Sequence, residues 1–263
     1  MHRYPRPGLA GFTVDSLVER PYSRCRMAPR FRCVLIDHDD TAVESTATVH
    51  YPAHLEALQV LRPGRVPPSQ EEWIVRNFHG IMEYLEGDLG LTRDEQLTEL
   101  AIWRRWTERS APPFYPGFLE LLGDFRRHGG LVVVISHSEA DVIESHYRAA
   151  QDPPFLPDLI FGWDHDDNRR KPSPWPVLEA LRRLSCAPSE ALIVDDLKPG
   201  VLMARAAGVS MAAAGWSHRI AEIETYMRAN ATWYCPRVED LRLLLLGEGS
   251  TAAPDALGKS ASP

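Results

Sequence analysis

Six short apolar runs, each bounded by polar or turn-forming residues, set the strongest limit on how this chain can fold. They cover residues 31–36, 131–136, 158–161, 191–194, 210–214 and 231–235. Runs of this length are typical of buried β-strands, and amphipathic helical patterns separate most of them. Strands that alternate with helices predict an α/β protein with a doubly wound parallel sheet.

The helices between these runs carry start and stop signals. Apolar residues repeat at helical spacing from Phe118 to Phe125. Ser138 has the sequence context of a residue that caps the N-terminus of the following helix. Pro174 and Pro199 predict two further helix starts, and the second of these helices is expected to end at Gly208.

Residues 47–116 interrupt the alternation because they contain no convincing strand. Ser69-x-x-Glu72 and Thr92-x-x-Glu95 both match the capping box that opens a helix. We therefore predict a helical cap over residues 47–116, which follows the first strand and lies over the C-terminal edge of the sheet. The core would comprise residues 31–46 and 117–246, between an N-terminal arm (1–30) and a disordered tail (247–263).

Composition excludes several classes of protein. The formal net charge of -7 disfavours a nucleic-acid surface, and no apolar stretch approaches the ~20 residues that a membrane-spanning helix needs. The four cysteines are far apart and lack the spacing of a zinc site. This cysteine usage suggests a reducing, cytoplasmic location.

Two carboxylates follow the first apolar run, in the segment Asp37-His38-Asp39-Asp40-Thr41. Alternate residues of an extended chain point to the same side, so Asp37 and Asp39 can face one ligand. In an open parallel sheet, ligands bind at this carboxyl edge. A turn that only caps a helix can have the same local sequence, so the assignment depends on the other strand ends.

Three other segments bring polar groups to the same edge. Ser136 ends the second run, Asp195 and Asp196 follow the fourth, and Lys171 stands just before a predicted helix. Carboxylates gathered in one cleft repel one another unless a cation is present. Oxygen ligands without sulfur favour Mg²⁺, and Mg²⁺ beside a lysine and a hydroxyl suits a phosphoryl group.

Four segments taken together resemble the motifs of the haloacid dehalogenase-like superfamily, in its phosphatase branch with a helical cap. The matching segments are residues 34–41, residues 134–136, Lys171-Pro172-x-Pro174, and residues 193–196 followed by residues 206–208. The resemblance extends over about residues 31–246. It implies a Rossmann-like core with an inserted cap, in a layout similar to phosphoglycolate phosphatases.

The resemblance implies a role for each of these residues. Asp37 would attack phosphorus and form an aspartyl-phosphate. Asp39 would protonate the leaving oxygen and then activate water, with its proton affinity raised by the neighbouring Asp37. The remaining members would hold the phosphoryl oxygens and orient the catalytic pair (Thr41, Ser136 and Lys171) or bind Mg²⁺ together with Asp37 (Asp195, Asp196 and the backbone carbonyl of Asp39).

Asp40 departs from the family pattern, which usually has glycine at this position. Glycine there lets the backbone approach the phosphate closely, so Asp40 is expected either to point away and cap the turn or to slow the reaction. His38 and His137, beside the motifs, and Arg76 and His79, in the predicted cap, are candidate substrate contacts.

Asp39 also distinguishes between reactions within the superfamily. Members that remove halogens typically lack this second acid, so its presence favours hydrolysis of phosphoesters. The predicted activity is a Mg²⁺-dependent phosphatase for a small phosphorylated metabolite, with no nucleic-acid or membrane partner. A sugar-phosphate mutase keeps both carboxylates and stays open. A catalytically weak binding or regulatory protein on the same fold, suggested by Asp40, also stays open, as does the oligomeric state.

Overall fold

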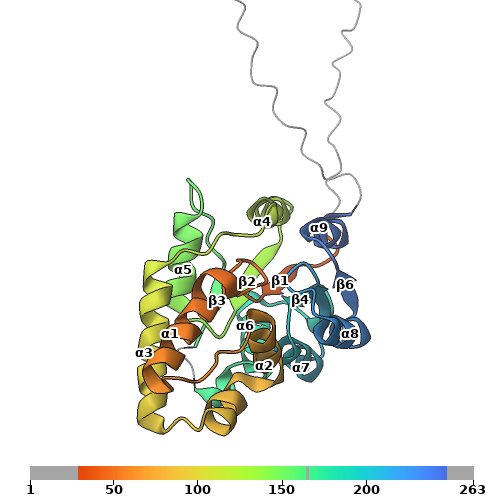
Figure 1. The fold of residues 1–263 in the computed structure, drawn as a ribbon. Coiled ribbons are helices and arrows are strands. Elements are labelled where there is room, and N and C mark those ends of the chain that lie inside the picture. Colours follow the sequence, from red (N-terminus) through yellow and green to blue (C-terminus); the bar gives the residue numbers. More distant parts are fainter. Residues whose placement is uncertain (1–28, 164–165, 248–263) are drawn as a thin grey trace, which may run out of the picture.

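One parallel sheet of six strands organises the computed structural model, which describes residues 29–163 and 166–247 (Figure 1). The strand order is β3-β2-β1-β4-β5-β6, and every neighbouring pair is parallel. This confirms the predicted doubly wound fold. The predicted arm and tail lie almost entirely outside the described residues. The strands are β1 (Cys33–Ile36), β2 (Leu131–Ile135), β3 (Leu159–Phe161), β4 (Ala191–Asp195), β5 (Ser210–Ala214) and β6 (Trp233–Cys235).

Helices cover both faces of the sheet and make it a three-layer core (Figure 1). Alternate strand residues point to opposite faces, so Val34 packs on one side of β1 and Leu35 on the other. The side of Val34 is covered by α4 (Phe118–Arg127), α5 (Ala140–Ala149) and α9 (Val238–Leu246). The side of Leu35 is covered by α6 (Trp175–Leu184), α7 (Lys198–Ala207) and α8 (Ala221–Asn230).

The predicted helix boundaries agree with the structure except at one position. Pro174 directly precedes α6. Gly208 follows the last residue of α7, as expected, and its φ of 67° is a left-handed conformation that glycine adopts without strain. Ser138 was predicted to cap α5, but Glu139 occupies that position and makes no side-chain cap. Two short 3₁₀ turns, η3 (Asp167–Arg169) and η4 (Pro188–Glu190), precede α6 and β4.

The segment from Thr46 to Arg109 contains helices and connecting loops but no strand. It lies between β1 and α4, and α4 leads into β2. Both predicted capping boxes, at Ser69 and Thr92, are confirmed by reciprocal side-chain and backbone hydrogen bonds. This inserted cap consists of a π-helical turn η1 (Thr46–His50), α1 (Tyr51–Leu61), α2 (Gln70–Met82), a second π-helical turn η2 (Glu83–Asp88) and α3 (Arg93–Arg109).

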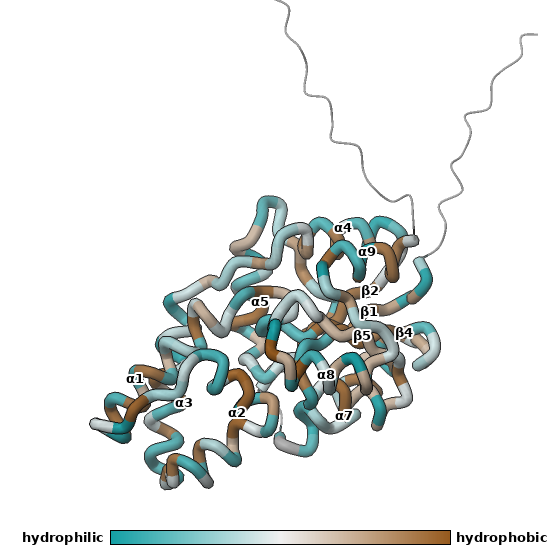
Figure 2. Tube along the Cα trace, turned by 45° about the vertical axis from the view of Figure 1, so that its right-hand side comes forward, coloured by the Kyte–Doolittle hydropathy of each residue, from teal (hydrophilic) through white to brown (hydrophobic). Residues whose placement is uncertain are grey.

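The cap contacts the core along α2, which lies beside α7 and α8. The rings of Phe78 and Tyr226 pack edge to face with centroids 5.2 Å apart, and His79 forms an ion pair with Glu222 at 2.8 Å. In Figure 2, which colours the chain by hydropathy, strands β1 and β2 run as apolar segments through the interior. Among the described helices, none combines the length and the apolar character needed to cross a membrane.

Candidate active site

The register of the central strands brings three charged residues together at the C-terminal edge of the sheet. Ile36 of β1 pairs with Val194 of β4, so Asp37 and Asp195 stand next to each other. Lys171, from the loop before α6, places its Nζ 2.6 Å from Asp37 Oδ1 and 3.0 Å from Asp195 Oδ2. All three side chains are buried. The sequence expectation that these groups gather at one edge agrees with this geometry.

The charges in this cluster are not balanced by the lysine alone. Burial raises the pKa of Asp37 well above its usual value; Lys171 opposes this effect, and the carboxylates of Asp195 and Asp196 add to it. Burial acts to lower the pKa of Lys171, but Asp195 and Asp37 outweigh it and raise that pKa. An additional cation would relieve the repulsion between these carboxylates.

The oxygen atoms present fit a hard divalent cation such as Mg²⁺. One carboxylate oxygen from each of Asp37, Asp195 and Asp196 lies within 4.8 Å of the others. Carboxylate oxygens are the ligands that Mg²⁺ prefers. Asp196 is held from two sides, because Thr41 Oγ1 donates to its Oδ1 at 3.1 Å and His218 Nε2 lies 2.7 Å from its Oδ2.

Asp39 is surrounded by hydrogen-bond donors. Ser136 and Ser138 donate their hydroxyls to Oδ2 at 3.0 and 2.6 Å, and His50 Nε2 lies 2.8 Å from Oδ1. Burial acts to raise the pKa of Asp39, but His50 and Ser138 outweigh it and hold that pKa well below its usual value. We expected a raised proton affinity from the proximity of Asp37; the donors around Asp39 reverse the direction.

Asp40 has the left-handed backbone conformation, with a φ of 56°. Aspartate adopts this conformation more readily than most residues, and glycine most readily of all. Its Oδ1 accepts hydrogen bonds from the backbone amides of Ser45 and Thr46 at 3.1 and 2.9 Å. Asp40 therefore caps the turn that leads into the cap, which is the first of the two possibilities that the sequence left open.

Two of the four candidate substrate contacts flank the motifs in very different environments. His38 is completely buried, and its Nε2 lies 3.0 Å from Nδ1 of His146. In contrast to the expectation, His38 has no exposed surface through which to contact a substrate. His137 is exposed, and its Nε2 lies 2.9 Å from the backbone oxygen of Lys171.

The two candidates in the cap are both engaged in ion pairs. Arg76 pairs with Asp88, and its guanidinium lies 4.6 Å from the centroid of the Tyr84 ring. His79 pairs with Glu222 on α8. Arg76 and His79 thus contribute to contacts within the cap and between the cap and the core.

Three residues at the site carry no sequence signal that identifies them as functional. His50 lies in a segment that the sequence assigned only to the helical cap. Ser138 was interpreted as a helix cap. His218 follows β5, in a loop that carries none of the four motifs. For His50, the signal that could have pointed to the site is its position near the start of the inserted cap. For Ser138, it is a second serine just after the Ser136 motif, and His218 has no such signal.

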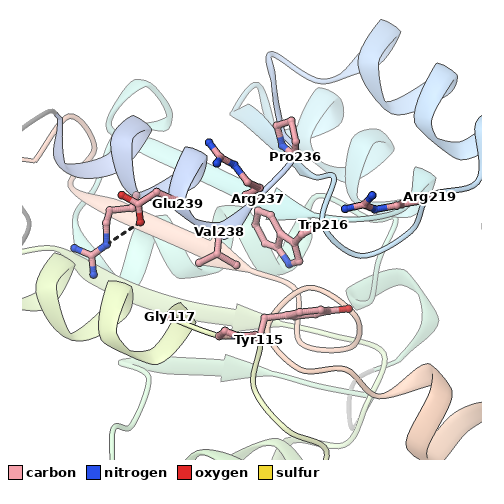
Figure 3. Close-up of a pocket in the computed structure, with 10 residues that line it drawn as sticks. Tyr115, Gly117, Trp216, Arg219, Pro236, Arg237, Val238 and Glu239 are labelled. Atoms are coloured by element: carbon pink, nitrogen blue, oxygen red, sulfur yellow. Dashed lines mark ion pairs between the residues drawn. The ribbon is translucent and has the colours of Figure 1, made fainter.

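A surface cavity of about 530 Å³ is lined in part by the loop that follows β5 (Figure 3). Tyr115 and Trp216 line it together with Arg219 and the start of α9, and no candidate catalytic residue does. The indole of Trp216 donates its N–H to the backbone oxygen of Thr41 at 3.1 Å. The cavity is thus separate from the carboxylate cluster, although one of its walls contacts the first motif.

The chain belongs to the haloacid dehalogenase-like hydrolase family, which it matches over residues 31–208. This agrees with the fold and with the four strand-end segments. Among curated proteins it is 34% identical over 98 residues to the bifunctional riboflavin kinase/FMN phosphatase of Arabidopsis thaliana, a match that covers 37% of this chain and only 26% of that protein. It is 23% identical over 188 residues to the pyrophosphatase PpaX of Bacillus velezensis, which covers 72% of this chain and 85% of that protein.

Solved structures of this family share the fold. A candidate phosphoglycolate phosphatase from Lactobacillus plantarum superposes with a TM-score of 0.66 at 19% identity, covering 81% of this chain and 99% of that chain. A variant of CbbY from Rhodobacter sphaeroides, in complex with xylulose-(1,5)-bisphosphate, has a TM-score of 0.62 at 21% identity, covering 79% and 94%. These similarities support the same core with its inserted cap.

Proposed function

We propose that this protein is a Mg²⁺-dependent phosphatase that hydrolyses a small phosphorylated metabolite through an aspartyl-phosphate on Asp37. The contact of Lys171 Nζ with both Asp37 and Asp195 is the observation that carries the proposal, because it joins a nucleophile, a cation and a metal-ligand set in one buried cluster. The names of the curated relatives, an FMN phosphatase and a pyrophosphatase, support a phosphorylated substrate.

The reaction would proceed in two steps at the two aspartates. In the first, a carboxylate oxygen of Asp37 attacks phosphorus, an Asp37 O–P bond forms, the P–O bond to the leaving group breaks, and Asp39 gives its proton to the leaving oxygen. In the second, Asp39 takes a proton from water, whose oxygen attacks phosphorus, releases phosphate and restores Asp37.

The other residues position these groups. Lys171, Thr41 and Ser136 would hold phosphoryl oxygens or orient the carboxylates. Mg²⁺, held by Asp37, Asp195, Asp196 and the backbone oxygen of Asp39, would supply positive charge against the phosphoryl group. A phosphoryl group beside Asp39 adds negative charge there and raises its pKa, which favours the protonated form that the first step requires.

We also propose how the chain divides into core and cap and where in the cell the protein is located. The core would comprise residues 31–46 and 117–246, and the cap residues 47–116. In the part of the chain that the structure describes, Cys33, Cys186 and Cys235 are buried and free. Reduced cysteines support a cytoplasmic location.

Release of inorganic phosphate from a panel of sugar phosphates, phosphorylated acids, nucleotides and pyrophosphate tests the proposal. We expect hydrolysis that requires Mg²⁺ and is abolished in Asp37→Asn, which has nearly the same size but cannot act as the nucleophile. Unchanged activity in Asp37→Asn, or no release from any compound, would contradict the proposal. Isomerised sugar phosphate in place of free phosphate would identify a mutase.

A further inference from the structure

Three consecutive residues of the loop after β5 make hydrogen bonds to residues of the candidate active site. Trp216 donates its indole N–H to the backbone oxygen of Thr41, and Ser217 donates its hydroxyl to the backbone oxygen just before Thr41. His218 lies 2.7 Å from a carboxylate oxygen of Asp196. The loop therefore contacts both the first motif and a predicted ligand of the metal.

We infer that His218 is a positioning residue that fixes the carboxylate of Asp196 for metal binding, an inference that rests on the proposed Mg²⁺-dependent function. The carboxylate only accepts hydrogen bonds, so Nε2 of His218 must carry a proton and donate it to Oδ2. An ionised carboxylate has about four acceptor positions on its two oxygens. Thr41 uses one at Oδ1 and His218 uses one at Oδ2, so each oxygen keeps a lone pair for a cation.

Burial strengthens the effect of the hydrogen bond between His218 and Asp196. His218 is 8% exposed and Asp196 is 4% exposed, so water has little access to replace the imidazole as a donor. Partners that hydrogen-bond to metal ligands orient them and typically contribute roughly 10- to 100-fold to metal affinity. Without the imidazole, the carboxylate of Asp196 would keep Thr41 as a donor at one oxygen only.

Asp40, the residue that departs from the family pattern, contributes to the same arrangement. Its Oδ2 lies 3.8 Å from Nε2 of His218, while its Oδ1 is fixed by the amides of Ser45 and Thr46. At 3.8 Å, Oδ2 of Asp40 lies beyond hydrogen-bond distance of Nε2, so the N–H of His218 is directed to Asp196 at 2.7 Å.

Calorimetric titration of the full-length protein with Mg²⁺ alone, without any phosphorylated compound, tests this role. We expect His218→Leu to weaken Mg²⁺ binding roughly 10-fold. His218→Gln should bind within about threefold of the parent protein, because its amide nitrogen can occupy the place of Nε2. If His218→Leu does not fold, His218→Asn replaces it, since its shorter amide stops short of Asp196 and predicts the same loss.

His54→Leu is the matched control. It removes another buried imidazole, which lies in the cap and makes a hydrogen bond with the Tyr84 hydroxyl at 3.2 Å. We expect it to leave Mg²⁺ affinity unchanged. Equal affinities of His218→Leu and the parent, or equal losses in His218→Leu and His218→Gln, would overturn the role of His218. A parent that binds no Mg²⁺ would overturn both proposals, whereas one that binds Mg²⁺ without releasing phosphate would count only against the phosphatase.

Discussion

The imidazole of His50 connects the inserted cap to the proposed acid of the active site: its Nε2 lies 2.8 Å from Oδ1 of Asp39. Trp103, on α3, donates its indole N–H to Nδ1 of the same ring at 2.8 Å. A nitrogen that accepts from Trp103 carries no proton, so the neutral ring has its proton on Nε2, facing Asp39. Two residues from the cap segment thus determine the hydrogen bond at Oδ1 of Asp39.

Replacement of His50 by leucine is expected to lower kcat roughly 10- to 100-fold with little change in KM, because Asp39 loses its donor at Oδ1, one of the three that orient it for proton transfer. Trp103→Phe keeps the ring but removes the N–H, and a smaller loss of kcat is expected. Steady-state kinetics on the best substrate measures both effects.

Trp106→Phe is the control for Trp103→Phe. The indole N–H of Trp106 donates to Glu56 at 2.8 Å and not to His50, so kcat of Trp106→Phe should equal that of the parent protein. Equal losses of kcat in Trp103→Phe and Trp106→Phe would mean that the two substitutions act by loosening the cap.

Replacement of Gly200 by alanine is expected to displace Asp195. A Cβ at this position of α7 would lie 2.2 Å from Cγ and 2.4 Å from Oδ2 of Asp195, the oxygen that accepts from Lys171. Gly200→Ala should therefore weaken Mg²⁺ binding and lower kcat, each roughly 10-fold or more. Gly123→Ala, in α4, places its Cβ 3.4 Å from the end of a flexible arginine; it should keep full activity and gain up to about 1 kcal/mol in the free energy of unfolding.

Replacement of Asp40 separates the charge of this residue from its conformation. Asp40→Ala removes the acceptor for two backbone amides and places alanine at a φ of 56°, so we expect a loss of about 2 kcal/mol in the free energy of unfolding. Asp40→Asn keeps an acceptor oxygen and tolerates this φ, and it should stay within about 0.5 kcal/mol of the parent. Urea denaturation measures both values, and equal stability of the two variants would refute this account.

The stability of the protein should fall with decreasing pH in part because of His54. Burial, with Arg76 contributing, lowers the pKa of His54 to about 4 from its usual 6.5. Between pH 6.5 and pH 4, the unfolded state therefore binds a proton at His54 that the folded state does not bind. The contribution of His54 to the free energy of unfolding is fully present above pH 6.5 and declines towards pH 4, by up to about 3 kcal/mol.

His54→Gln removes this titration and keeps an acceptor for Tyr84. The free energy of unfolding, measured by denaturation at several pH values, should depend less steeply on pH in His54→Gln than in the parent protein. His38 remains in both proteins, so the difference in slope isolates His54, and identical slopes would disprove its contribution.

The fold was predictable because its signals are local. Each apolar run that became a strand was short and bounded, and the capping boxes at Ser69 and Thr92 opened α2 and α3 as expected. Ser138 shows where local reasoning fails: its sequence context is that of a helix cap, but its hydroxyl donates to Asp39, 99 residues away along the chain. The helix begins one residue later, with Glu139 at the cap position, and the hydroxyl of Ser138 is oriented by a carboxylate that only the fold brings close.

The strands, the cap insertion and the edge where Asp37, Lys171 and Asp195 gather follow from the sequence alone, because hydrophobic periodicity and parallel strands fix which residues stand at a strand end. The donors that surround these carboxylates depend instead on the tertiary structure. His50 reaches Asp39 from the cap, and His218 reaches Asp196 from the loop after β5. Such contacts depend on how distant segments pack, and that packing, more than the local sequence, sets the hydrogen bonds and pKa of each carboxylate.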